Sequence, residues 1–152
     1  MLITDEQFTS CRQTVMDANP NMTPELAGRI VEEALKFVAA CAYNPGAGLV
    51  PSRIVDEGWH ALIVHTAMYA DLCQRLGGSF VHHAPGYGPE NYAPAILDRT
   101  REAIVALGWT VDTELWAAPN DESLVSVAAK CQHSDDSGPI VTIPKPKPKG
   151  VV

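Results

Sequence analysis

Apolar residues recur at helical spacing through most of this chain, and residues that start or stop helices lie between these segments. The first segment begins near Thr4, whose hydroxyl can cap a helix, and Gln7 three residues later completes a capping-box pattern. A proline at position 20 ends it, because proline cannot continue a helix. The apolar positions of this predicted helix are Phe8, Cys11 and Val15.

The second amphipathic segment has clear start signals. Thr23 occupies the cap, Pro24 the first helical position, and Glu25 the first turn, where the helix dipole favours an acidic side chain. The sequence Asn-Pro-Gly at 44–46 ends the segment. Its apolar residues form one stripe: Leu26, Ile30, Ala34, Phe37, Val38 and Cys41.

The pattern of residues 53–76 predicts one long helix at the centre of the fold. Ser52 is a suitable cap, and Gly77 can occupy the position after the last turn. One seam of this helix combines residues at alternating spacings of four and three: Val55, Trp59, Leu62, Thr66, Tyr69, Cys73 and Leu76. Further apolar side chains widen the seam to more than half of the circumference, which indicates a helix surrounded by others.

The C-terminal third predicts shorter elements. A helix is expected over residues 93–107, ending at a glycine. Residues 110–119 permit a short strand, but Asp112 near the start and Pro119 at the end favour a short capped helix. Another short helix is expected over residues 122–130.

These elements predict an all-α fold in a single domain over residues 1–138. Four main helices form a bundle around the central helix at 53–76, followed by the short C-terminal helices. Residues 139–152 alternate proline with lysine, which is typical of an extended or flexible polyproline II tail. With 152 residues the chain can bury a sizeable core.

Charge and hydropathy exclude several classes of partner. Eleven basic and eighteen acidic residues give a formal net charge of −7, whereas nucleic-acid binding draws on Lys and Arg that displace counterions. No apolar run approaches the roughly 18 residues of a membrane span, and no secretory signal is apparent at the N-terminus. We therefore expect a cytoplasmic protein that binds neither nucleic acid nor membranes. The acidic surface or the Pro/Lys tail could engage a protein partner, and the oligomeric state is open.

The four cysteines are widely spaced and include no CxxC pair: Cys11, Cys41, Cys73 and Cys131. Three of them fall on apolar faces of predicted helices, so buried free thiols are the simplest interpretation. A disulfide framework is not expected in a cytoplasmic chain of this size. Cys131 and His133 form a CxH pair, which alone is weak evidence for a metal site.

Histidines supply the candidate chemistry, and four of the five lie between Val55 and His83. His60 lies four residues after Asp56, so the two side chains share one helix face. A carboxylate at that spacing can orient an imidazole that acts as a base or as a metal ligand. Asp56 and His60 are therefore the candidate catalytic pair. The alternative is an ordinary solvated face, because acidic residues are common in the first turn of a helix.

The other histidines are less easily joined to this pair. His65 lies about 140° around a straight helix from His60, so the two rings cannot easily share an ion. It could equally be a core histidine bonded to the backbone or to a tyrosine. His82 and His83 follow an extended stretch, where neighbouring side chains point to opposite sides. If residues 53–76 form a straight helix, the glycine turn at 77–78 lies about 24 Å from His60 along the helix axis. His82 and His83 could therefore reach the neighbourhood of His65 more easily than that of His60.

A longer set of residues spans this region: Val55-Asp56-Glu57-Gly58-Trp59-His60, His65, Tyr69, Cys73, Gly78, Phe80, His82 and His83. It resembles the signature segment of the glycine-rich domain-containing-protein-like family, and especially small actinobacterial proteins related to it. The match covers about thirty residues of the chain. The long glycine-rich region is missing, and Leu62 stands where plant members often carry a further histidine. The resemblance implies no settled activity, but it implies that the Asp-Trp-His and His-His elements form one module.

The leading hypothesis is a small metal-binding protein, with an enzymatic role left open. The expected ligands are His60, His65, His82 and His83, with Asp56 as a further ligand or an orienting partner. Zinc is the first expectation for such a nitrogen-rich site, and other transition metals remain open. One alternative is a non-catalytic protein-interaction module whose histidines are structural. Another is a metal-free hydrolase that uses His60 with Asp56.

Overall fold

The computed structural model of the chain describes residues 1–84 and 94–117. The described residues form helices and connecting loops, without a strand. The helices are α1 (Asp5–Ala18), α2 (Pro24–Tyr43), α3 (Arg53–Val64), α4 (Thr66–Gly77) and α5 (Pro94–Ala106). The all-α prediction is therefore confirmed for this part of the chain. The predicted helix at 122–130 and the tail at 139–152 lie outside the described residues, as does the domain boundary at 138.

The predicted capping residues cap the first three helices in the structure. The hydroxyl of Thr4 accepts the Gln7 amide at 3.2 Å, and the Gln7 side chain accepts the Thr4 amide at 2.9 Å. Thr23 and Ser52 cap α2 and α3 in the same way, each accepting a backbone N–H three residues on. These bonds satisfy amides that have no partner within the helix. Local sequence thus determines where three of the helices begin.

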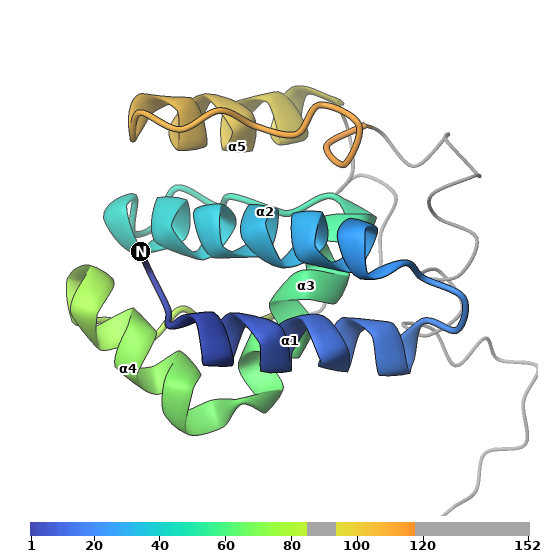
Figure 1. The fold of residues 1–152 in the computed structure, drawn as a ribbon. Helices are drawn as coiled ribbons and strands as arrows, with labels where there is room; N and C mark the ends of the chain where they lie inside the picture. Colours follow the sequence, from blue (N-terminus) through green and yellow to red (C-terminus); the bar gives the residue numbers. More distant parts are fainter. Residues whose placement is uncertain (85–93, 118–152) are drawn as a thin grey trace, which may run out of the picture.

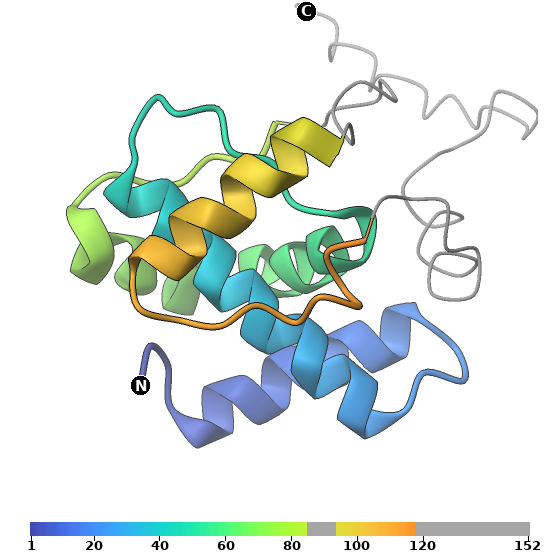
Figure 2. The same cartoon turned by 90° about the horizontal axis from the view of Figure 1, so that it is seen from above.

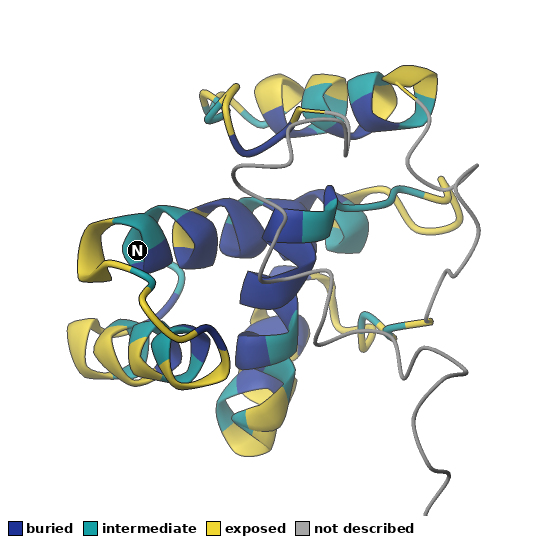
Figure 3. Cartoon of the chain, turned by 90° about the vertical axis from the view of Figure 1, so that its right-hand side faces the viewer, coloured by how far each residue is buried: buried dark blue, intermediate teal, exposed yellow. Residues whose placement is uncertain are grey.

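The centre of the bundle is α2 rather than the segment at 53–76. This helix packs against each of the other four, and Figure 1 shows it between α5 on one side and α1, α3 and α4 on the other. Seen from above in Figure 2, α5 crosses over α2. Figure 3 shows the buried residues where the helices face each other. Half of the residues of α2 are buried. The central position that was expected for residues 53–76 therefore belongs to α2.

The prediction of one helix over 53–76 is wrong, because the chain breaks at His65 into α3 and α4. His65 has φ −85° and ψ 63°, which is not a helical conformation. Its Nε2 lies 2.9 Å from the Thr14 hydroxyl on α1, so a tertiary hydrogen bond accompanies the break. Residues 63–66 are Ile, Val, His and Thr, three of them β-branched and all weak helix formers. Both halves keep the same apolar seam, which is why the sequence pattern looks continuous.

Gly58 sets the approach of α3 to α2. A Cβ at this position would lie 2.6 Å from the carbonyl oxygen of Ile30 and 2.8 Å from the Cβ of Ala34. Any side chain larger than hydrogen would therefore push the two helices apart. This close contact fixes the rotation of α3, and with it the direction in which the neighbouring polar residues project.

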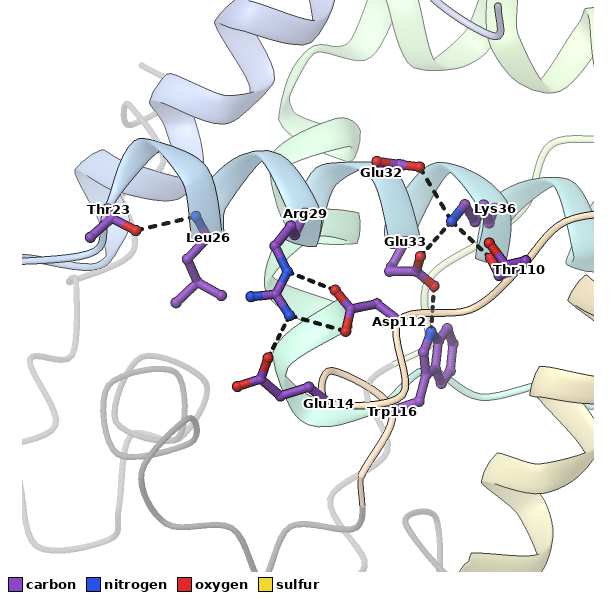
Figure 4. A network of polar contacts seen from close by, with 10 residues as sticks. All are labelled: Thr23, Leu26, Arg29, Glu32, Glu33, Lys36, Thr110, Asp112, Glu114 and Trp116. Carbon is purple, nitrogen blue, oxygen red and sulfur yellow. Dashed lines mark hydrogen bonds and ion pairs between the residues drawn. The ribbon is translucent and has the colours of Figure 1, made fainter.

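Residues 109–117 run along α2 without forming the expected short helix. They contain only a hydrogen-bonded turn, in which Leu115 and Trp116 donate to the carbonyl of Asp112. Side chains of α2 hold this segment in place through what we call the α2 clamp (Figure 4). The clamp consists of Arg29, Glu33, Lys36, Thr110, Asp112, Glu114 and Trp116. The tertiary contacts to α2 replace the regular structure that the segment lacks.

Two further expectations can be compared with the structure. Cys11 and Cys73 are buried and Cys41 is partly buried, and all three are free thiols as predicted. Cys131 lies outside the described residues. Across residues 1–84 and 94–117, none of the helices combines the length and the apolar character that crossing a membrane requires.

Candidate metal centre

Helix α3 supplies two of the polar residues at the candidate site, Asp56 and His60. The helix start is anchored by Ser52, whose hydroxyl also donates to the carbonyl of Leu115 at 2.6 Å. Asp56 lies in the first turn and is only 7% exposed, whereas the side chain of His60 is 39% exposed. The spacing of four residues places both on one face, with His60 Nε2 3.7 Å from Asp56 Oδ2.

The third polar residue, His83, arrives from the segment after α4. Gly78 ends α4 with φ 78°, the left-handed conformation that glycine adopts without strain, and turns the chain back. The phenol of Tyr69 then donates a hydrogen bond to the carbonyl of Val81 at 2.6 Å and accepts one from Trp59 Nε1 at 2.9 Å. This pair of bonds fixes the returning segment beside α3.

The three residues meet at short distances and form what we call the triad. His83 Nε2 lies 2.9 Å from His60 Nε2 and 3.0 Å from Asp56 Oδ1. The ring of His83 also packs on Trp59, with ring centroids 4.5 Å apart. Ligand atoms from all three side chains lie within 4.8 Å of one another. In the described residues, this is the group of His, Cys, Asp and Glu with the spacing of a metal site.

The surroundings of His60 favour its neutral form, which can donate an electron pair to a metal ion. Two ring nitrogens 2.9 Å apart cannot both carry a hydrogen directed at the other. Burial lowers the pKa of His60, and the neighbouring His83 acts in the same direction, while Asp56 opposes the shift. The neutral imidazole is the form that binds metal ions. The triad therefore contains at least one lone pair that must be matched by a proton or by a cation.

The triad has the dimensions of a coordination site. Nitrogen and oxygen ligands bind zinc at about 2.0–2.2 Å, so two adjacent ligand atoms lie roughly 2.8–3.1 Å apart in octahedral geometry and roughly 3.3–3.6 Å apart in tetrahedral geometry. The nitrogen–nitrogen separation of 2.9 Å and the nitrogen–oxygen separation of 3.0 Å match the octahedral range, and His60 Nε2 lies 3.7 Å from Asp56 Oδ2. Two imidazoles and one carboxylate are also a common ligand set for zinc and for non-haem iron. The residues present fit a transition-metal ion.

Of the four histidines expected as ligands, the structure brings two together and places the other two elsewhere. His65 lies at the break between α3 and α4, where its Nε2 contacts the hydroxyl of Thr14. His82 is exposed and packs against the ring of Phe80, with centroids 4.9 Å apart. His83 is half-buried beside α3, so the two neighbouring rings face different surroundings. Asp56, by contrast, lies beside both His60 and His83.

Trp59 and Tyr69 were both recognised in the sequence, but the contact between them was not predicted. Tyr69 and Trp59 are ten positions apart and belong to different helices, so no local spacing reveals their hydrogen bond. His133 and Cys131 lie outside the described residues. The pairing of Asp56 with His83 depends on how the chain returns after α4, at Gly78 and beside Tyr69.

Glu57, the neighbour of Asp56, contacts Asn19 rather than the triad. It is 5% exposed, and its Oε2 accepts a hydrogen bond from the Asn19 side chain at 3.3 Å. Burial raises the pKa of its carboxyl group, and the charge of Asp56 adds to the effect, while the bond from Asn19 opposes it. Glu57 Oε1 and Asn19 Oδ1 are both buried acceptors without a hydrogen-bond partner.

A pocket of about 290 Å³ adjoins the returning segment. Trp59, Val81 and His82 form part of its lining, and the loop at 44–49 forms much of the rest. None of the described residues that line it is Asp, Glu, Lys or Arg, so it offers room for an uncharged molecule. Trp59 is common to this pocket and to the surroundings of the triad.

Comparison with known proteins assigns the chain to a family. Residues 2–91 match the UCP032817-like family, a range that includes α1 to α4 and all three residues of the triad. The chain belongs to the UCP032817-like family. The resemblance to the glycine-rich domain-containing-protein-like family is therefore wrong, because the family that matches residues 2–91 is the UCP032817-like family. No curated protein and no solved structure gives a significant match. In this UCP032817-like protein, α5 lies beyond the matched range. So do the residues of the α2 clamp that follow α5, namely Thr110, Asp112, Glu114 and Trp116.

Proposed function

We propose that this protein binds a divalent transition-metal ion through Asp56, His60 and His83. The observation that carries the proposal is the convergence of two imidazole nitrogens and one carboxylate within 4.8 Å, from a helix and from a segment 23 residues later in the chain. Exposed acidic clusters occur commonly without an ion, but here the aspartate is buried and two histidines face it. Such groups are normally paired or bound to a metal.

Zinc is the first choice for the ion. It accepts imidazole and carboxylate ligands at the separations found here and has no strict geometric preference. The same two-histidine, one-carboxylate set also binds ferrous iron, so the donor set narrows the choice to ions of this class rather than to one element. Calcium and magnesium fit poorly, because they prefer oxygen ligands.

Three protein ligands would leave part of the coordination sphere for a small molecule. Structural zinc sites usually use four protein ligands, whereas catalytic sites use three and keep a position for water or substrate. The exposure of the triad is uneven: the side chain of His60 is 39% exposed, compared with 17% for His83 and 10% for Asp56. Solvent therefore reaches the site from the His60 side. This arrangement favours a reactive site over a purely structural one.

Elemental analysis and zinc titration of the full chain, purified without a histidine tag, test the proposal. We expect about one ion per chain, and a rise in melting temperature on adding zinc, because a ligand that binds the folded state stabilises it. His60→Ala and His83→Ala should weaken zinc binding by more than about 100-fold, beyond the loss usual for an outer-shell partner.

Two matched controls come from the same segment of the chain. His65→Ala and His82→Ala remove the same side chain near the triad and should leave zinc affinity within about twofold of the native protein. Less than roughly 0.2 ion per chain, with no thermal shift from zinc, copper or cobalt, would overturn the proposal. Equal losses in all four variants would also contradict it, since binding would then not depend on the triad.

A further inference from the structure

His83 reaches the triad through a segment that has few contacts of its own. Of residues 78–84, only Val81 and His83 are partly buried, and the other five are exposed. A loop with so few buried groups has little to fix its path. The contacts that hold Val81 and His83 must therefore determine where the His83 ring lies.

Tyr69 provides the contact at Val81. Its side chain is fully buried in α4, and its hydroxyl makes two hydrogen bonds, donating to Val81 O at 2.6 Å and accepting from Trp59 Nε1 at 2.9 Å. Burial raises the pKa of the Tyr69 phenol, so the group keeps its proton and remains a donor. The ring of Phe80 also packs edge-on against Tyr69, with centroids 5.1 Å apart.

Trp59 provides the contact at His83. Its ring packs on the His83 ring at 4.5 Å between centroids, while its N–H is bonded to Tyr69. One indole therefore touches both the metal-ligand candidate and the residue that anchors the loop. Trp59 itself is held by Phe37 of α2, with ring centroids 4.8 Å apart. The chain of contacts runs from the bundle core to the third residue of the triad.

We propose that Tyr69 is a positioning residue for the metal centre, which fixes His83 at ligand distance through the carbonyl of Val81 and with the support of Trp59. The proposal rests on the metal-binding function proposed above. Tyr69 does not touch the triad and would not bind the ion. Its role is to keep the returning segment in the one path that places His83 Nε2 beside Asp56 and His60. Partners that orient ligands in this way commonly contribute 10- to 100-fold to metal affinity, by a rough rule.

The test is Tyr69→Phe in the full chain, with zinc affinity measured by competition against a chromophoric chelator. The phenylalanine keeps the buried ring but removes both hydrogen bonds, so we expect zinc binding to weaken by about 10- to 100-fold. The helical circular dichroism of the metal-free protein should stay unchanged. Thr100→Val is the matched control, because Thr100 also uses a buried hydroxyl to bind a loop carbonyl, that of Val50, at 2.8 Å. This variant should lose stability without losing zinc affinity.

A second measurement does not depend on the ion. In the metal-free native protein, the Trp59 ring should shift the proton resonances of His83, and Tyr69→Phe should remove that ring-current shift. An unchanged His83 spectrum and zinc affinity within about twofold of the native value would overturn the positioning role. So would an equal loss of affinity in Tyr69→Phe and Thr100→Val. If the native protein binds no zinc but the His83 shift still depends on Tyr69, the metal function fails while the positioning of His83 stands.

Discussion

Two buried carboxylates lie on neighbouring helices, and their partners differ in kind. Glu33 of the α2 clamp is 2% exposed, and it accepts hydrogen bonds from Lys36 Nζ at 2.6 Å and from Trp116 Nε1 at 2.7 Å. Asp56 of the triad is similarly buried but faces two imidazoles. An ammonium and an indole are donors at every physiological pH, whereas an imidazole donates or accepts according to its protonation.

Because of this difference, the α2 clamp can stabilise the fold by itself, whereas the triad has the chemistry to bind a metal ion. The α2 clamp is complete without any addition, because a fixed positive charge and fixed donors match its carboxylates (Figure 4). In the triad, the facing nitrogens of His60 and His83 need a proton or an ion between them. The two regions are joined by packed rings: Phe37 lies 6.4 Å from Trp116 and 4.8 Å from Trp59, measured between centroids. Their roles can therefore be separated only by substitution.

The largest effect should come from Glu33→Ala. The change leaves the Trp116 N–H without its acceptor and removes the closest carboxylate of Lys36, whose side chain is 14% exposed, while Lys36 keeps Glu32 and the Thr110 carbonyl. We expect the free energy of unfolding to fall by about 2–4 kcal/mol, as for other broken buried pairs. Zinc affinity should stay within about twofold of the native value, because the clamp contributes no ligand. Urea unfolding and chelator competition measure the two quantities.

Glu32→Ala is the matched control for this substitution. Glu32 also pairs with Lys36, at 3.3 Å, but its side chain is 62% exposed. Removing an exposed ion-pair partner should cost less than about 1 kcal/mol. Equal effects of the two substitutions would show that burial does not matter here. A loss of zinc affinity in Glu33→Ala would show instead that the packed rings of Trp116, Phe37 and Trp59 couple the clamp to the triad.

A smaller effect is expected from Glu57→Gln in the metal-free protein. Burial raises the pKa of Glu57, so its favourable contribution is complete below the unfolded value of about 4.3 and is lost as the pH rises through the folded value. A glutamine at this position stays neutral at every pH and so avoids the cost of burying a charge. The variant should therefore be more stable than the native protein at pH 8, and the difference should shrink towards pH 4.

Urea unfolding over a pH series measures this slope. Glu102→Gln, which changes an exposed glutamate of α5, serves as the control and should leave the slope as it is. The same pH dependence in native protein and in Glu57→Gln would contradict the prediction. It would mean that Glu57 is ionised in the folded state without a measurable cost.

The smallest effect belongs to Asp112→Asn, at the exposed end of the α2 clamp. The hydrogen bonds from Arg29 lower the pKa of Asp112, so the stability they provide is present above the unfolded pKa of about 3.9 and is lost as the pH falls through the folded value. Because both side chains are partly exposed, we expect about 1 kcal/mol or less, decreasing with added salt. Thermal melts should show a smaller difference at pH 3 than at neutral pH, because pH 3 lies below the unfolded pKa and the contribution has begun to fall. A difference of equal size at both pH values would exclude the ion pair as its cause.

The parts of the fold that follow from sequence are those set by local chemistry. The caps at Thr4, Thr23 and Ser52 act through side chains three residues from their partners, so the sequence alone places these helix starts. The break at His65 is different, because the contact that accompanies it is with Thr14, 51 residues away. Weak helix formers at 63–66 hint at it, but the continuous apolar seam conceals it.

The candidate site shows the same division. Asp56 and His60 are four residues apart on a helix, and their shared face could be predicted. His83 could be selected over His82 only with knowledge of how the chain returns after α4, which Tyr69 and Gly78 determine. His65 was expected as a ligand, but the non-helical conformation at the break directs it to α1 instead. A resemblance built on the histidine pattern could not resolve these alternatives.

The Nε2 atoms of His60 and His83 join points that are 23 positions apart in sequence. An ion held between them would act as a removable cross-link that closes this stretch of chain, comparable to a disulfide but governed by metal supply instead of redox state. Cross-linking of this kind restricts the opening of the closed loop. Amide hydrogen exchange between Thr66 and Ala84 would then depend on free metal concentration, while exchange in α1 and α2 would change far less. The return of the chain after Gly78 would thus make the local rigidity of this protein adjustable by its surroundings.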